Sequence, residues 1–162
     1  MNINNPVNYW YALRLQLDSK LKWHLRHLLV AKQVSTWSKD PSTQCGAVIV
    51  DKLNRPVSWG TNGFPRKVKD DKRLFNREVK YSMVLHAEEN AVLFAKRDLT
   101  GHSIYVWPSQ PCAHCSSVIS QVGIDFVGFA KTKNSINDRW KDNYRIARKT
   151  LKESKILSLI HI

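Results

Sequence analysis

His86-Ala87-Glu88 and Pro111-Cys112-Ala113-His114-Cys115 are the two stretches around which this chain of 162 residues is organised. One histidine and two cysteines form a donor set typical of zinc, and a glutamate two residues after the histidine is suited to proton transfer. Because the two stretches lie apart in the sequence, a shared site requires a fold that brings them together. The rest of the chain is therefore interpreted as the scaffold and walls of that site.

The spacing of the candidate ligands indicates an open, catalytic zinc site. Cys112 and Cys115 are three residues apart at the start of a predicted helix, so both sulfurs lie on one side, and a helix N-terminus lowers the pKa of a thiol. His86, at the start of another predicted helix, supplies a nitrogen to the same ion. Three protein ligands leave the fourth tetrahedral position for water. Glu88 points away from the metal yet reaches that water, so it is the predicted proton shuttle.

Three neighbouring residues have other interpretations. His114 as a fourth ligand would close the site and make it structural, but its place between the cysteines points it away from their common side. Glu89 is predicted to face solvent, and Cys45 to be a buried residue of a strand. Three cysteines with one close pair favour a metal site in a reducing compartment over a disulfide framework.

The composition predicts one globular domain over residues 1–162, with an extra N-terminal helix in residues 1–20. Hydrophobic residues make up 43% of the chain and six are tryptophans, which suffices for one core. No apolar run approaches the ~18 residues of a membrane span, and the polar amino end lacks a signal-peptide core, so we expect a cytoplasmic protein without a membrane partner. The net charge of +13 attracts phosphates on either nucleotides or nucleic acid.

Hydrophobic patterns predict a mixed α/β chain. Helices are expected over 19–39, 87–96, 111–122 and 140–151, and strands over 47–50, 57–59, 103–106, 125–129 and 156–160. Residues 61–80 combine many charges with Gly63 and Pro65, which indicates a long functional loop with a short helix. This order predicts a three-layer α/β/α fold, in which helices cover both faces of a mixed sheet of about five strands.

The two motifs match the H-x-E and P-C-x-x-C signature of zinc deaminases. Four stretches together, at 38–50, 60–66, 86–91 and 111–115, resemble the cytidine deaminase superfamily and within it the deoxycytidylate (dCMP) deaminases. The resemblance spans roughly residues 21–157. The 23 residues 63–85 favour the dCMP branch, because transfer-RNA adenosine deaminases are expected to have a shorter connection there.

The resemblance implies an enzyme, a hydrolase that removes the 4-amino group of dCMP with one catalytic Zn²⁺. The products are ammonia and dUMP, which supplies dTMP synthesis. Glu88 would move the protons at ring C4. The Ala87 backbone N–H would hold the base carbonyl, the Ser109 carbonyl would face the amino group, and Asn62 would contact the sugar.

Phosphate and regulatory contacts follow from the same resemblance. Arg66 and Lys67 come directly after the matching Asn-Gly-Phe-Pro stretch and are the predicted phosphate ligands. Family members often form hexamers that are activated by dCTP, here expected with Mg²⁺, and inhibited by dTTP. Their regulatory Gly-Tyr-Asn-Gly segment corresponds to Gly60, Thr61, Asn62 and Gly63. The sequence departs from the family with Thr61 in place of that tyrosine and Trp37 where an arginine is common.

Other functions remain open from the sequence. The basic surface permits a zinc deaminase that edits RNA or single-stranded DNA, although the basic residues are dispersed and form no stripe, so a nucleic-acid partner is the weaker expectation. A nucleotide deaminase that accepts dCTP is a second alternative. A catalytically silent zinc- or nucleotide-binding protein would leave Glu88 without a task.

Overall fold

The computed structural model describes residues 19–130 and 138–161. In chain order the elements are α2 (Ser19–Ser35), β1 (Gly46–Val50), β2 (Pro56–Thr61), η1 (Lys72–Phe75), α3 (Arg77–Met83), α4 (Ala87–Ala95), β3 (Ser103–Trp107), α5 (Ala113–Gln121), β4 (Phe126–Ala130), η3 (Asp138–Trp140), α6 (Lys141–Glu153) and β5 (Leu157–His161). Most of the helix predicted over 1–20 lies outside the described residues. Residues 19–20 belong to α2, which starts where the following helix was predicted to start.

The five strands form one mixed sheet in the order β2-β1-β3-β4-β5. β1 pairs antiparallel with both β2 and β3, whereas β3, β4 and β5 are parallel and are connected through α5 and α6. The structure therefore confirms the predicted mixed sheet. Within the described residues, no helix is both long and apolar enough to cross a membrane.

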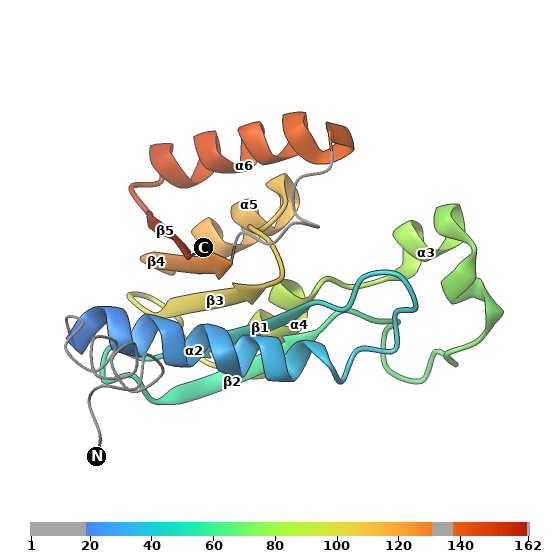
Figure 1. The fold of residues 1–162 in the computed structure, drawn as a ribbon, viewed down its shortest axis with the longest axis horizontal. Helices are drawn as coiled ribbons and strands as arrows, with labels where there is room; N and C mark the ends of the chain where they lie inside the picture. The colour runs from blue at the N-terminus through green and yellow to red at the C-terminus, as the bar shows by residue number, and fades with distance from the viewer. Residues whose placement is uncertain (1–18, 131–137, 162) are drawn as a thin grey trace, which may run out of the picture.

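Helices cover both faces of the sheet, which confirms the three-layer arrangement. Alternate residues of β1 point to opposite faces, so Val48 and Val50 pack with α2 while Ala47 and Ile49 belong to the core that includes α4, α5 and α6. Figure 1 shows α2 running along β1 and β2, and α5 and α6 stacked beside β4 and β5. Leu28, a residue of α2, is only 4% exposed against this sheet.

The strand ends bring the two motifs to one edge of the sheet. Gly46 at the start of β1 lies opposite both Thr61, which ends β2, and Trp107, which ends β3. The segments that lead into α4 and α5 therefore begin at the same edge. Gly60 allows α4 to approach β2, because a Cβ there would lie 2.3 Å from the Ala87 carbonyl oxygen. The connection between β2 and α4 holds η1 and α3 and extends away from the sheet (Figure 1).

Candidate metal centre and active site

His86 stands at the N-cap of α4, where its backbone turns from extended to helical. Its backbone N–H donates a hydrogen bond of 2.7 Å to the Glu89 carboxylate, which forms a capping box. The helix therefore starts at a fixed residue, and the imidazole is held at the mouth of α4. The same start buries Ala87 and Glu88, the first two residues of the helix.

Cys112 occupies the matching position on the second helix. It is the N-cap of α5, and its Sγ accepts a hydrogen bond of 3.4 Å from the Cys115 backbone N–H. The prediction that Pro111 is the first helical residue is wrong, because the backbone of Cys112 is still extended and α5 begins at Ala113. The three-residue spacing nevertheless places both buried thiols on the same side, as predicted.

These three side chains meet with the spacing that a zinc ion requires. His86 Nδ1 lies 3.5 Å from Cys112 Sγ and 3.3 Å from Cys115 Sγ, and all three donor atoms lie within 4.8 Å of one another. Tetrahedral zinc with ordinary Zn–N and Zn–S bonds sets nitrogen–sulfur distances of about 3.5 Å. The donor set and its dimensions therefore fit zinc. His114 lies outside this cluster.

Without a metal ion, the three side chains of the cluster share protons through hydrogen bonds. Hydrogen bonds from Cys115 and from His86 lower the pKa of the Cys112 thiol to about 4. The hydrogen bond to that thiolate raises the pKa of His86 to about 9. The hydrogen bond to Cys112, assisted by burial, raises the pKa of Cys115. A metal ion would replace the protons held by His86 and Cys115, so metal binding would release protons.

Glu88 is buried beside the cluster. The residue is 5% exposed. Burial raises the pKa of this carboxyl to about 7. The charge of His86 lowers that pKa, and the charge of Cys112 raises it. A carboxyl in such surroundings is suited to accept and return a proton.

Glu89 links the two motif helices, a contact that was not predicted from the sequence. One carboxylate oxygen accepts from the His86 backbone N–H, and the other lies 3.1 Å from His114 Nε2 on α5. The prediction that Glu89 faces solvent is wrong, because its side chain is 17% exposed. The signal was the glutamate at the third helical position after His86, a known feature of helix starts.

Helix α6 supports the turn that precedes Cys112 and the start of α5 that follows it. The Asn143 side-chain oxygen accepts a 2.8 Å hydrogen bond from the Ala113 backbone N–H. Tyr144 donates through its hydroxyl to Ser109 Oγ at 3.1 Å, and the Tyr144 carbonyl accepts from Gln110. No local sequence pattern predicts these contacts, because they join residues 30, 34 and 35 positions apart. The structure places Ser109 in this turn and Ala87 at the start of α4.

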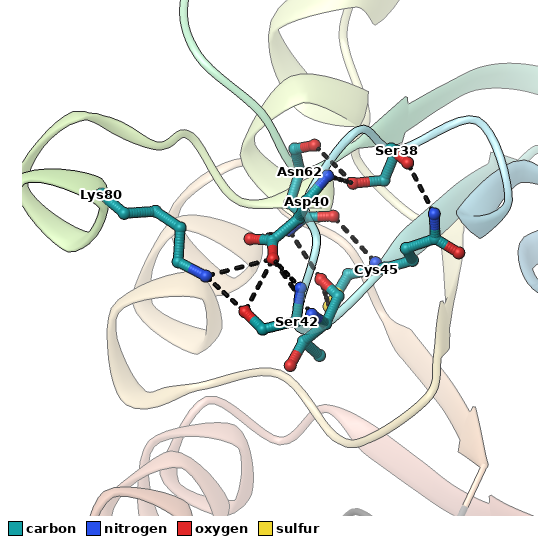
Figure 2. A network of polar contacts seen from close by, with 8 residues as sticks. Ser38, Asp40, Ser42, Cys45, Asn62 and Lys80 are labelled. Carbon is teal, nitrogen blue, oxygen red and sulfur yellow. Dashed lines mark hydrogen bonds and ion pairs between the residues drawn. The ribbon is translucent and has the colours of Figure 1, made fainter. Parts of the chain in front are cut away.

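A second group of polar residues lies at the same edge of the sheet. Figure 2 shows this cluster, which we call the Ser38–Lys80 network and which comprises Ser38, Asp40, Ser42, Thr43, Gln44, Cys45, Asn62 and Lys80. Asn62 is 7% exposed at its centre, directly after β2. Cys45 stands one residue before β1 and is half-buried, so the prediction of a buried strand residue is wrong. Burial raises the pKa of its thiol to about 12, which leaves it protonated.

Three of the predicted substrate and regulatory residues lie together beside α4. Thr61, Gly63 and Arg66 line a hollow of about 430 Å³ beside α4, whose other lining residues are Phe64, Pro65, Leu85, Asn90, Leu93, Phe94 and Lys96. The Arg66 guanidinium carbon lies 5.0 Å from the centre of the Phe94 ring. Lys67 is exposed in a left-handed backbone conformation and is not part of this lining. At the end of β2, Thr61 and Gly63 therefore line the hollow, whereas Asn62 between them belongs to the Ser38–Lys80 network.

Sequence comparison places the chain among known deaminases. A family model described as the cytidine and deoxycytidylate deaminase zinc-binding region matches residues 21–131. An uncharacterised deaminase from the luxG 3′ region of Aliivibrio fischeri is 46% identical over 127 residues, which are 78% of this chain and 85% of that protein. Human deoxycytidylate deaminase is 37% identical over 128 residues, which are 75% of this chain and 71% of the human protein.

Solved structures show the same fold. The dCMP deaminase of cyanophage S-TIM5, crystallised in complex with dCMP and dUMP, superposes with a TM-score of 0.68 at 19% sequence identity. The match covers 90% of this chain and 100% of the phage chain. It establishes the three-layer architecture for nearly the whole described chain.

Proposed function

Since the chain belongs to the family of cytidine and deoxycytidylate deaminases, we propose that it hydrolyses dCMP to dUMP and ammonia. The main support is the cluster of His86, Cys112 and Cys115 with Glu88 buried beside it. The deoxycytidylate deaminases among its relatives favour dCMP as the substrate. The hydrolysis needs no cofactor besides the metal.

In this mechanism His86, Cys112 and Cys115 would hold the zinc ion. When bound, zinc supplies a Lewis acid that lowers the pKa of water. Glu88 takes a proton from the attacking water and transfers protons to ring N3 and to the departing amine. A C–O bond forms at ring C4 and the bond from C4 to the exocyclic amino nitrogen breaks. The product dUMP therefore retains the oxygen of the water, and ammonia leaves. Burial of Glu88 keeps bulk water away from these transfers.

The proposal includes four contacts that orient the nucleotide. As the first residue of α4, Ala87 has a backbone N–H without a partner inside the helix, which suits the base carbonyl. The Ser109 carbonyl would face the amino group, and Asn62 would accept from the sugar. Lys67, exposed after the Asn62 segment, is the proposed phosphate ligand.

Regulation by dCTP with Mg²⁺ and by dTTP is a further part of the proposal, together with a hexamer. The hollow beside α4 supports it, because about 430 Å³ is within the usual range for small-molecule sites and its walls combine Arg66 and Lys96 with Phe94. Arg66 would then meet the phosphates of a nucleotide in the hollow. The short side chain of Thr61 would leave room there that a tyrosine would fill. The supply of dUMP to dTMP synthesis, a single domain and a cytoplasmic location complete the proposal.

A panel of substrates tests the proposed reaction. Ammonia release is measured from dCMP, dCTP, deoxycytidine and a cytosine-containing single-stranded oligonucleotide, with the zinc-loaded full chain. We expect dCMP to react fastest, because the sugar and phosphate contacts add to those of the base. A preference for the oligonucleotide would identify a strand-editing enzyme instead, and a preference for dCTP would identify a triphosphate deaminase. Repeating the dCMP assay with added dCTP and Mg²⁺, or with dTTP, tests regulation.

A further inference from the structure

Lys80 is a buried cation in a segment that the reaction described above does not use. It lies on α3, in the connection between β2 and α4, and its Nζ is 3.1 Å from Asp40 Oδ1 and also donates to Ser42 Oγ. The Lys80 and Asp40 side chains are 9% and 5% exposed. A charge this far from solvent persists only when it is paired and hydrogen-bonded. Lys80 therefore fastens the connection to residues 38–45.

Asp40 connects Lys80 to Asn62 through hydrogen bonds to both residues. The Oδ1 atom of Asp40 accepts from Lys80 and from the backbone N–H groups of Ser42 and Thr43, while its Oδ2 accepts from Asn62 Nδ2 at 3.3 Å. Figure 2 shows Lys80 reaching across to Asp40 while Asn62 lies on the far side of that carboxylate. The carboxylate is thus a bridge between the cation and the amide.

The contacts around Asn62 determine which way its amide points. Its two N–H groups donate to Asp40 Oδ2 and, at 2.9 Å, to the Thr43 carbonyl, while its Oδ1 accepts from the Cys45 backbone N–H at 2.8 Å. Two acceptors on one side and a donor on the other exclude the flipped amide. An amide oxygen has two lone pairs, so the remaining capacity of Asn62 is one acceptor site. It can therefore serve only a ligand group that donates.

We infer that Lys80 is a positioning residue, which by holding Asp40 orients Asn62 Oδ1 to accept a hydrogen bond from the sugar hydroxyl of the nucleotide. This inference rests on the proposed function. The deoxyribose of dCMP has one hydroxyl, at the 3′ carbon, and that group is the only donor on the sugar. Without Lys80 the Asp40 carboxylate would be buried without its cation, and residues 38–45 would rearrange to hydrate it. Asn62 would then lose its fixed orientation.

A substrate that lacks the hydroxyl tests this assignment directly. We compare kcat/KM for dCMP and for 2′,3′-dideoxy-CMP, which keeps the base and the phosphate, in wild type, Lys80→Met and Lys80→Arg. One hydrogen bond makes wild type prefer dCMP by about tenfold. We expect Lys80→Met to reduce this preference to about one, mainly through a higher KM for dCMP, because the accepting atom is no longer held. Lys80→Arg keeps the cation and should keep most of the preference.

The ratio between the two substrates separates positioning from general damage. A merely structural role would slow both substrates by the same factor and leave the ratio at its wild-type value, which would overturn the inference. Zinc content and thermal midpoint are measured for every variant. If Lys80→Met does not fold, the double variant Lys80→Met with Asp40→Asn replaces it, since it breaks the same bridge and removes both members of the buried ion pair. An unchanged ratio in this folded double variant would equally overturn the inference.

The same data distinguish this inference from the proposed function. A zinc-loaded wild-type protein that releases no ammonia from dCMP would refute the proposed function. A wild-type protein that is active on dCMP, but shows no preference over the dideoxy analogue, would leave the proposed function standing and refute the role of Lys80.

Discussion

The metal centre and the Ser38–Lys80 network lie at the same edge of the sheet, where β1 begins and β2 and β3 end, but they are assembled in different ways. The metal ligands come from two short motifs, each at the first turn of a helix. The network joins residues 38–45, Asn62 and Lys80, which are brought together from three separate segments. One region depends on local helix geometry and the other on long-range packing.

The difference concerns what stabilises each region. At the metal centre a bound ion would hold the three ligands together, and the helix starts already place them at the required distances. The network relies on hydrogen bonds and one ion pair between buried polar groups, in which each lost partner leaves another group unpaired. We therefore expect substitutions at the metal centre to reduce mainly the rate of the reaction. Substitutions in the network should reduce mainly the stability of the protein and the orientation of the substrate.

The largest expected effect comes from Glu88→Gln at the metal centre. Because the amide cannot take a proton from water, we expect kcat on dCMP to fall by about 10²–10⁴-fold, with the zinc content and the unfolding free energy close to wild type. Ammonia release and zinc analysis of the same preparation measure both. Turnover near the wild-type rate would refute the role assigned to Glu88.

The network should show its largest effect in stability. Lys80→Met leaves the Asp40 charge buried without a cation, and breaking a buried ion pair in this way costs about 3–5 kcal/mol. Urea unfolding of the variant and of Lys80→Arg measures this cost. The double variant Lys80→Met with Asp40→Asn should recover part of it, because no uncompensated charge remains. A loss below about 1 kcal/mol in Lys80→Met would mean that the pair behaves like an exposed one.

The stability contributions of the network and of the α2 side of the sheet should be lost at different pH values. Burial raises the pKa of Asp40, but backbone N–H groups of Thr43 and Ser42, with Lys80, lower it to a net value below the ordinary one. This contribution to stability is present above the unfolded pKa of about 3.9 and is lost as the pH falls through the folded pKa. Burial lowers the pKa of His27, so its contribution is present above about pH 6.5 and is lost as the pH falls from there.

Each variant is compared with wild type from pH 7 to pH 3, because Glu88, whose pKa burial raises to about 7, titrates in the same range with the opposite effect on stability. The difference in unfolding free energy between wild type and His27→Gln should change below about pH 6.5, and the difference between wild type and Asp40→Asn below about pH 4. A difference for Asp40→Asn that stays constant down to pH 3 would contradict the role given to Asp40.

The smallest effect is expected where the two motif helices meet at the surface. The His114 side chain is 71% exposed, so removing its contact with Glu89 in His114→Ala should cost at most about 1 kcal/mol. Glu89→Ala also removes the cap of α4 and should cost more, about 0.5–2 kcal/mol. Thermal midpoints of the two variants measure the difference. An equal loss in both would show that the cap contributes little.

Much of the fold could be predicted from sequence, because the signals are local. Short apolar runs identified the strands, and the H-x-E and P-C-x-x-C spacings identified the three ligands that the structure brings together. Errors were small where they concerned helix starts, such as Pro111, since an N-cap residue can be recognised only within one or two positions. Glu89 was misplaced because a single sequence does not show which of its neighbours will cover a helix face.

The sequence by itself identified the two candidate cysteine ligands, because residues three apart at a helix start lie on one side wherever the helix is placed. Only the tertiary structure decided that Lys80 is buried, and that Asn62 can offer an acceptor and nothing else. The physical reason is that the burial of a charge and the satisfaction of an amide depend on groups that other segments bring to it. Lys80 and Asp40 are 40 residues apart, and no local pattern specifies that they will meet.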